Sequence, residues 1–236
     1  MAGRHIRVPS SGGSGEFDCY LALPSGDTKT PAVVLASAVH GVNADIRGIA
    51  DEFAAKGFIA AAPDLFWRTL PGPLPREDER AGQRSQPRMP VLKSGETDMA
   101  DTLAMVRTLP LHNGRTASMG FCFGGPYAVI GPKRLGFDAG IGCHSTQMKD
   151  FLHEFDGLEK PVCLIWGDRD FAAPPEVLAA YTERAQRQPS LAVHVFPGVE
   201  HGYMMRENAK AWSPQTYEFS MDKALAILQG LRAGKQ

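Results

Sequence analysis

The chain has 236 residues, of which 43% are hydrophobic and 22% are charged, and its formal net charge is −1. This balance is typical of a water-soluble globular protein, and the length suits a single domain spanning residues 1–236. A net charge this small gives no electrostatic reason to expect nucleic acid or a membrane surface as a partner.

The cysteines and the first residues of the chain indicate in which cellular compartment the protein is expected. The four cysteines show no CxxC pairing and no short ligand spacing with histidine, so we expect neither a metal site nor a cofactor held by them. The sequence holds no apolar run near the ~18 residues that a membrane span needs, and its start lacks the apolar core of a secretory signal. We therefore expect a cytoplasmic protein with free thiols.

Short apolar runs alternate with helical stretches along the chain. The segment 16–23 alternates weakly in hydrophobicity and predicts an early antiparallel strand. Continuous apolar runs predict buried strands at 32–37, 58–62, 115–119, 139–143, 161–166 and 191–196. Helical spacing predicts helices at 44–57, 96–109, 126–130, 175–187 and 213–231. This order predicts an α/β fold with a mostly parallel central sheet and helices on both faces.

Residues 64–95 interrupt this alternation. The segment is rich in proline and arginine and poor in aliphatic residues. A loop of this length in a compact domain is usually functional or disordered, and strands continue normally on both sides of it. We therefore predict a loop insertion near the active site rather than a linker between domains.

The stretch Met119-Gly-Phe-Cys-Phe-Gly-Gly125 places Cys122 between two glycines, directly after a predicted strand. Asp170 and His201 also follow predicted strands. In an open parallel sheet, ligands bind beyond the carboxyl ends of the strands. The order nucleophile, acid, histidine is that of the α/β-hydrolase triad, so the three residues are candidates for a Cys-His-Asp triad.

The residue types fit this chemistry. A nucleophile on a sharp strand-to-helix turn has crowded backbone around it, which Gly120 and Gly124 would relieve. The amide of Phe123 could donate to a developing oxyanion. Asp170 would orient the imidazole of His201, which would take or share the thiol proton.

Each residue also has a plainer interpretation. Cys122 alone could be a small buried residue, and an aspartate after a strand is most often a cap or a turn former. Asp168 competes with Asp170 for the role of the acid. Only the conjunction of all three at strand ends, in triad order, favours catalysis.

Five short motifs in this order resemble the dienelactone hydrolase family. They are HGVN (40–43), PDLF (63–66), GFCFGG (120–125), GDRD (167–170) and EHGY (200–203). The resemblance implies an α/β-hydrolase fold and a monomeric, cofactor-free enzyme that acts on a small-molecule ester or lactone. It also implies Cys122 as nucleophile, Asp170 as acid, His201 as base, and the backbone amides of Phe123 and Val39 as oxyanion donors.

Family members use arginines near the site to hold a substrate carboxylate, a task that suits a planar guanidinium. Arg206, Arg80 and Arg84 are candidates for this role, and His40 and His144 are candidates for further substrate contacts or for a second base. Each of these side chains could equally be an ordinary solvated residue.

The chain departs from the family pattern at Ala38, where relatives carry a glutamate that is thought to take the thiol proton. No carboxylate occurs between Val33 and Asn43. Either Cys122 rests as a thiolate paired with protonated His201, or a second histidine serves as base. Two alternatives to a dienelactone hydrolase stay open: a promiscuous small-ester hydrolase and a non-catalytic binding protein of the same fold.

Overall fold

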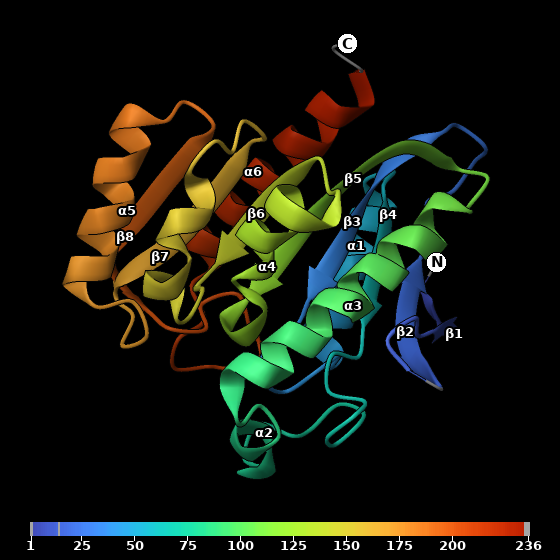
Figure 1. Cartoon of the computed structure of the whole chain (residues 1–236), viewed down its shortest axis with the longest axis horizontal. Coiled ribbons are helices and arrows are strands. Elements are labelled where there is room, and N and C mark those ends of the chain that lie inside the picture. The colour runs from blue at the N-terminus through green and yellow to red at the C-terminus, as the bar shows by residue number, and fades with distance from the viewer. Residues whose placement is uncertain (1, 14, 234–236) are drawn as a thin grey trace.

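The computed structural model describes residues 2–13 and 15–233, and its centre is one eight-stranded sheet (Figure 1). The strands lie in the order β1-β2-β4-β3-β5-β6-β7-β8. Their bounds are β1 (Arg4–Pro9), β2 (Glu16–Ala22), β3 (Thr30–Ala36), β4 (Ile59–Pro63), β5 (His112–Phe121), β6 (Ala139–Cys143), β7 (Val162–Arg169) and β8 (Leu191–Glu200). Strands β3 to β8 pair in parallel, whereas β1 and β2 pair antiparallel. The predicted α/β fold with a mostly parallel sheet is confirmed.

Helices cover both faces of the sheet. The α-helices are α1 (Ala44–Ala55), α2 (Arg80–Gln83), α3 (Arg88–Arg107), α4 (Tyr127–Ile130), α5 (Pro175–Arg187) and α6 (Pro214–Ala233). Shorter helical segments are η1 (Cys122–Gly124), η2 (Gly131–Leu135) and η3 (Met148–Phe155). In Figure 1, α3 and α4 lie in front of the sheet, and α1 and α6 lie behind it.

The alternation of side chains along β3 explains this layering. Val33 and Leu35 point to one face and pack with α1 and α6, while Val34 and Ala36 point to the other and pack with α3 and α4. Both faces are buried, which is why the strand reads as a continuous apolar run. Asn43 caps α1 as expected, because its side-chain oxygen accepts from the amide of Ile46 at 3.2 Å.

The segment 64–95 is not a continuous loop, and this part of the prediction is wrong. It contains α2, and α3 begins at Arg88 rather than at Glu96. Pro87 has extended backbone and precedes the helix, and Pro90 lies in its first turn, where a missing amide costs no helical hydrogen bond. Buried Val91 and Leu92 then anchor this early turn to the core.

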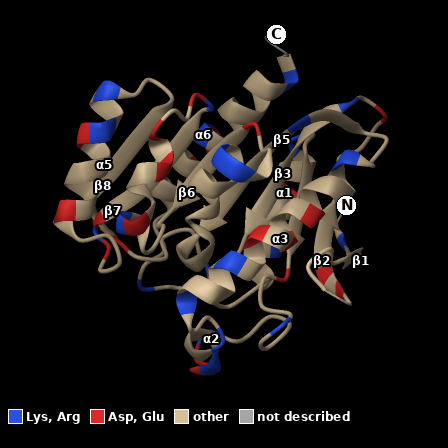
Figure 2. Ribbon diagram, in the orientation of Figure 1, with Lys and Arg blue, Asp and Glu red and all other residues tan. Residues whose placement is uncertain are grey.

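Strand β1 was not predicted from the sequence. It is an edge strand in which His5, Arg7 and other exposed side chains outnumber the buried ones, so its sequence lacks an apolar run. Figure 2 shows acidic and basic residues interspersed over the ribbon, in line with the small net charge. Among the described residues, the structure holds no helix that is long and apolar enough to cross a membrane.

Candidate active site

The register of the parallel strands brings the candidate residues to one edge of the sheet. Phe121 pairs with Cys143, so the next residues, Cys122 and His144, leave neighbouring strands side by side. In the same way, Arg169 pairs with Glu200, and Asp170 and His201 follow directly.

Cys122 occupies a sharp turn between β5 and η1, with a backbone φ of 51°, in the left-handed region that non-glycine residues rarely adopt. A Cβ at Gly120 would lie 2.1 Å from the carbonyl oxygen of Gly124, and one at Gly124 would lie 2.2 Å from that of Ala36. Only glycine fits at these two positions. The Cys122 carbonyl accepts from the amide of Thr146 at 3.1 Å, which helps to hold the turn.

Asp170 and His201 form a buried pair. Nδ1 of His201 lies 2.8 and 2.9 Å from the two carboxylate oxygens of Asp170, whose side chain is fully buried. The amide of Ala172 also donates to Asp170 at 2.8 Å and fixes the carboxylate. Asp168, the competing acid, instead accepts from the amide of Gly198 at 2.7 Å and does not contact His201 in the described structure.

A cavity of about 240 Å³ opens beside Cys122 and His201. It is lined by Ala38, Val39, His40, Arg76, Cys122, His144, Phe171, His201, Gly202, Met205 and Asn208. Within the described part of the chain, this lining contains no carboxylate, and Ala38 stands in it where relatives are expected to carry glutamate. The ionisable side chains that line the cavity beside Cys122 are those of His40, His144, His201 and Arg76.

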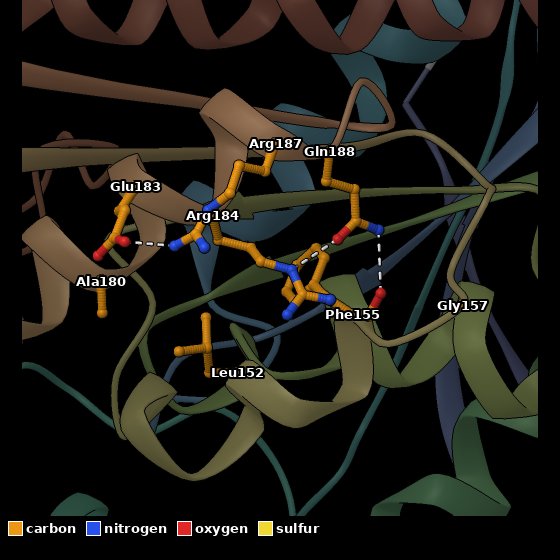
Figure 3. Close-up of a pocket in the computed structure, with 8 residues that line it drawn as sticks. All are labelled: Leu152, Phe155, Gly157, Ala180, Glu183, Arg184, Arg187 and Gln188. Atoms are coloured by element: carbon orange, nitrogen blue, oxygen red, sulfur yellow. Dashed lines mark hydrogen bonds and ion pairs between the residues drawn. The ribbon is translucent and has the colours of Figure 1, made fainter.

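A second hollow, of about 370 Å³, lies between η3 and α5 and is shown in Figure 3. Its charged side chains already have partners: Arg187 pairs with Glu183, and Arg184 donates to Gln188 at 2.8 Å. Its lining carries neither cysteine nor histidine. Of these two hollows, only the smaller one is lined by cysteine and histidine.

The surroundings of Cys122 and His201 favour a charged pair. Burial acts to raise the pKa of Cys122, but the hydrogen bond and charge of His201, the charge of Arg88 and the amide of Phe123 outweigh it, so the pKa lies below its ordinary value. Burial likewise acts to lower the pKa of His201, but hydrogen bonds to Asp170 and Cys122 raise it to about 10. Both shifts act in the direction of a thiolate beside an imidazolium.

The remaining three cysteines are different. Cys19, Cys143 and Cys163 lie buried in β2, β6 and β7. Burial raises the pKa of Cys143 to about 12 and that of Cys163 to about 11, and it raises that of Cys19 further. They are thiols in the core, and Cys122 is set apart by its access to the cavity.

The three arginines predicted to bind substrate are not among the described residues that line this cavity. Arg206 pairs with Glu52 at 2.7 Å and borders a different hollow. Arg80 pairs with Asp78 at 2.6 Å and is exposed. Buried Arg84 donates to the carbonyl of Val39 at 2.9 Å and to those of Leu70 and Gly72. These hydrogen bonds tie the backbone of Val39 to that of residues 70–72.

Two other arginines do approach the site, and the sequence analysis missed both. Arg76 lines the cavity. Arg88 donates to the Thr146 hydroxyl, and its guanidinium lies 4.8 Å from the centre of the Phe123 ring. A helix predicted to begin at residue 88 rather than 96 would have placed Arg88 in its first turn. Arg76 lies in an irregular segment, where no sequence pattern indicates the position of its side chain.

His40, His144 and Val39, all candidates from the sequence, do line the cavity. The amide of Phe123, the other predicted oxyanion donor, contributes to the lowered pKa of Cys122. Phe171 was missed: its side chain is 84% exposed and its ring lies 4.9 Å from that of His201, at the cavity mouth. A large apolar residue directly after the proposed acid was the signal available in the sequence.

A parallel sheet of this order, with a cysteine on a strained turn after β5 and a histidine after β8, defines an α/β-hydrolase fold. The sequence profile of the dienelactone hydrolase family matches residues 17–230, and the chain belongs to this family of hydrolases. The carboxymethylenebutenolidase 1 of Cupriavidus pinatubonensis is 28% identical, over 84% of this chain and 85% of its own length.

Two solved structures share the fold. A dienelactone hydrolase from Anabaena variabilis superposes with a TM-score of 0.69 at 15% identity, covering 98% of this chain and 99% of the other. A dienelactone hydrolase-like promiscuous phosphotriesterase from metagenomic libraries reaches a TM-score of 0.80 at 17% identity, covering 98% of this chain and all of the other.

Proposed function

We propose that this chain hydrolyses small esters or lactones with Cys122 as nucleophile, His201 as general base and acid, and Asp170 as the group that orients His201. The observation that carries this proposal is that Cys122 and His201 line one cavity while His201 is hydrogen-bonded to buried Asp170. The lowered pKa of Cys122 and the raised pKa of His201 support it.

The reaction would proceed through a thioester. The Cys122 thiolate attacks the carbonyl carbon of the ester, and the amides of Phe123 and Val39 hold the developing oxyanion. Protonated His201 gives its proton to the leaving alkoxide. Neutral His201 then takes a proton from water, which attacks the thioester and releases the acid and the thiolate.

The missing glutamate is compatible with this scheme. If Cys122 already rests as a thiolate beside His201, no carboxylate is needed to remove the thiol proton when substrate binds. Arg88 supports that state, because its positive charge also favours the thiolate.

The cavity favours small substrates. Its volume is about 240 Å³. Pockets that hold drug-sized ligands have larger volumes, of about 300–1,000 Å³. The described lining holds no carboxylate. This favours the promiscuous small-ester hydrolase, which acts on varied small esters, over an enzyme that acts on a dienelactone alone.

A substrate panel tests the proposed function. We expect turnover of p-nitrophenyl acetate and p-nitrophenyl butyrate, measured by nitrophenolate release, and falling rates with longer acyl chains. Comparison with a dienelactone separates the two enzyme hypotheses: a kcat/KM for the dienelactone far above that for the esters would favour a dedicated lactonase. Failure to turn over any of these substrates would favour the non-catalytic protein.

Arg76 is proposed to hold a carboxylate of the substrate, the role that was first assigned to other arginines. It lines the cavity, is exposed, and makes no hydrogen bond or ion pair with the described residues. We expect Arg76→Met to raise KM about tenfold for a p-nitrophenyl monoester of glutaric acid, which keeps a free carboxylate, because a charge-assisted hydrogen bond is lost. KM for neutral p-nitrophenyl butyrate should stay within about twofold.

Arg80→Met is the matched control for this prediction, since Arg80 lies nearby in the chain, is exposed, and pairs with Asp78. It should leave both KM values unchanged. An equal rise of KM for the charged and the neutral ester in Arg76→Met would contradict the assignment.

A further inference from the structure

His144 is a buried histidine whose ring nitrogens have no hydrogen-bond partner in the described structure. Its side chain is 1% exposed, and both Nδ1 and Nε2 are unpaired. A buried polar group without a partner destabilises the folded protein, so such groups are rare. A phenylalanine would fill the same space without this cost, which indicates that the imidazole serves something other than packing.

The surroundings of His144 hold its ring in place beside the reacting groups. The ring lies edge-on to His201, with 5.0 Å between ring centres, and edge-on to Tyr203 at 5.3 Å. It follows β6 with a left-handed backbone φ of 40°, a strained conformation outside glycine. Its side chain lines the same cavity as Cys122 and His201.

His144 is the neutral member of the two histidines. Burial lowers its pKa well below the ordinary value, and the charges of His201 and Arg76 lower it further. A neutral imidazole has one ring N–H that donates and one ring nitrogen that accepts. His144 can therefore accept a hydrogen bond at neutral pH while His201 is charged.

We propose that His144 positions the hydrolytic water during deacylation, an inference that rests on the proposed function. His201 is neutral at this stage, because it has given its proton to the leaving group. The water donates one hydrogen to His201, which takes it as a proton, and the other to the acceptor nitrogen of His144. An oxygen lone pair is thereby aimed at the thioester carbonyl carbon. The new C–O bond forms, the C–S bond breaks, and Cys122 leaves as the thiolate beside protonated His201.

The first half-reaction does not require this contact. During acylation the nucleophile is the resting thiolate, and the proton for the leaving group comes from His201. Loss of the His144 nitrogens should consequently slow deacylation and spare acylation, a split that a general loss of packing would not produce.

Stopped-flow measurement of nitrophenolate release from p-nitrophenyl acetate separates the two steps. In His144→Phe we expect the rate of the first, acylation phase to stay within about threefold of that of the unmodified protein. The steady-state rate should fall about 10²-fold, a loss of the size that misplacing a reacting group causes. Mass spectrometry should then show Cys122 carrying one acetyl group.

A variant that keeps a hydrogen-bonding side chain provides the rescue. His144→Gln should recover the steady-state rate to within about tenfold of the unmodified protein, because its carbonyl oxygen accepts a hydrogen bond.

His194→Phe is the matched control, since His194 packs against Phe219 away from the cavity, and both phases should be unchanged. Thermal unfolding curves check that each variant is folded; if His144→Phe is not, His144→Leu takes its place.

The outcomes are distinct. An unchanged steady-state rate in a folded His144→Phe, or equal losses in both phases, would overturn the role of His144 while leaving the proposed function intact. If the unmodified protein turns over p-nitrophenyl acetate but hydroxylamine-sensitive acetylation never occurs at Cys122, the proposed function fails, and the role of His144 fails with it.

Discussion

Replacing Cys122 with alanine is expected to lower kcat/KM for p-nitrophenyl acetate by about 10⁴-fold or more. The side chain that would form the covalent bond is removed, while the oxyanion donors and the cavity remain, so only residual catalysis should survive. The thiol is the one cysteine of the described chain that lines the cavity, and its pKa is lowered rather than raised. Initial rates of nitrophenolate release measure the loss.

The matched control is Cys163→Ala. Cys163 is equally a cysteine at a strand of the sheet, but it is buried in the core. Its removal should lower the unfolding temperature by a few degrees at most and leave kcat/KM within about twofold. A Cys122→Ala variant that retains most of its activity would show that hydrolysis does not pass through a thioester.

The fold could be predicted from the sequence because its signals are local. Continuous apolar runs marked the buried strands, and residues 139–143 and 175–187 were placed with the bounds that the structure shows. The signal failed where burial is partial. Strand β1 is an exposed edge, and the start of α3 is rich in proline and arginine, so neither carries a clear apolar pattern.

In the candidate site, the residues that directly follow strands could be predicted from the sequence, whereas the positions of the arginine side chains could not. Cys122, His144, Asp170 and His201 each follow a strand directly, and the register of a parallel sheet fixes where such residues lie. Arginines on irregular segments have long side chains, and distant contacts decide where these side chains end. Arg84 donates to carbonyls from two separate segments, and no local sequence pattern predicts these contacts. Arg76, by contrast, lines the cavity.

Replacing Asp170 with asparagine is expected to lower kcat by about 10³–10⁴-fold, as in other triads in which the acid loses its charge. Asparagine is nearly isosteric, so the fold should persist. Its amide can donate to Nδ1 of His201, which would place the remaining ring proton on Nε2. In that tautomer His201 cannot take a proton from the hydrolytic water. The loss of the carboxylate charge also lowers the pKa of His201 from about 10. A smaller fraction of His201 is then protonated, so the Cys122 thiolate is stabilised less.

The pH dependence of Cys122 alkylation by iodoacetamide measures this second effect. In the unmodified protein the thiolate is present above the lowered pKa of Cys122, so fast alkylation should extend to lower pH than for an ordinary thiol and fall off as the pH drops through that pKa. In Asp170→Asn the pKa of Cys122 should rise, and fast alkylation should require a higher pH.

Asp168→Asn is the matched control, because Asp168 stands two residues earlier and holds the amide of Gly198 instead of His201. It should preserve both kcat and the alkylation profile. The reverse result, with Asp168→Asn inactive and Asp170→Asn active, would move the acid of the triad to Asp168. An alkylation profile that does not change in Asp170→Asn would mean that the carboxylate acts only on the tautomer of His201, and that the resting charge of Cys122 depends on His201 and Arg88 alone.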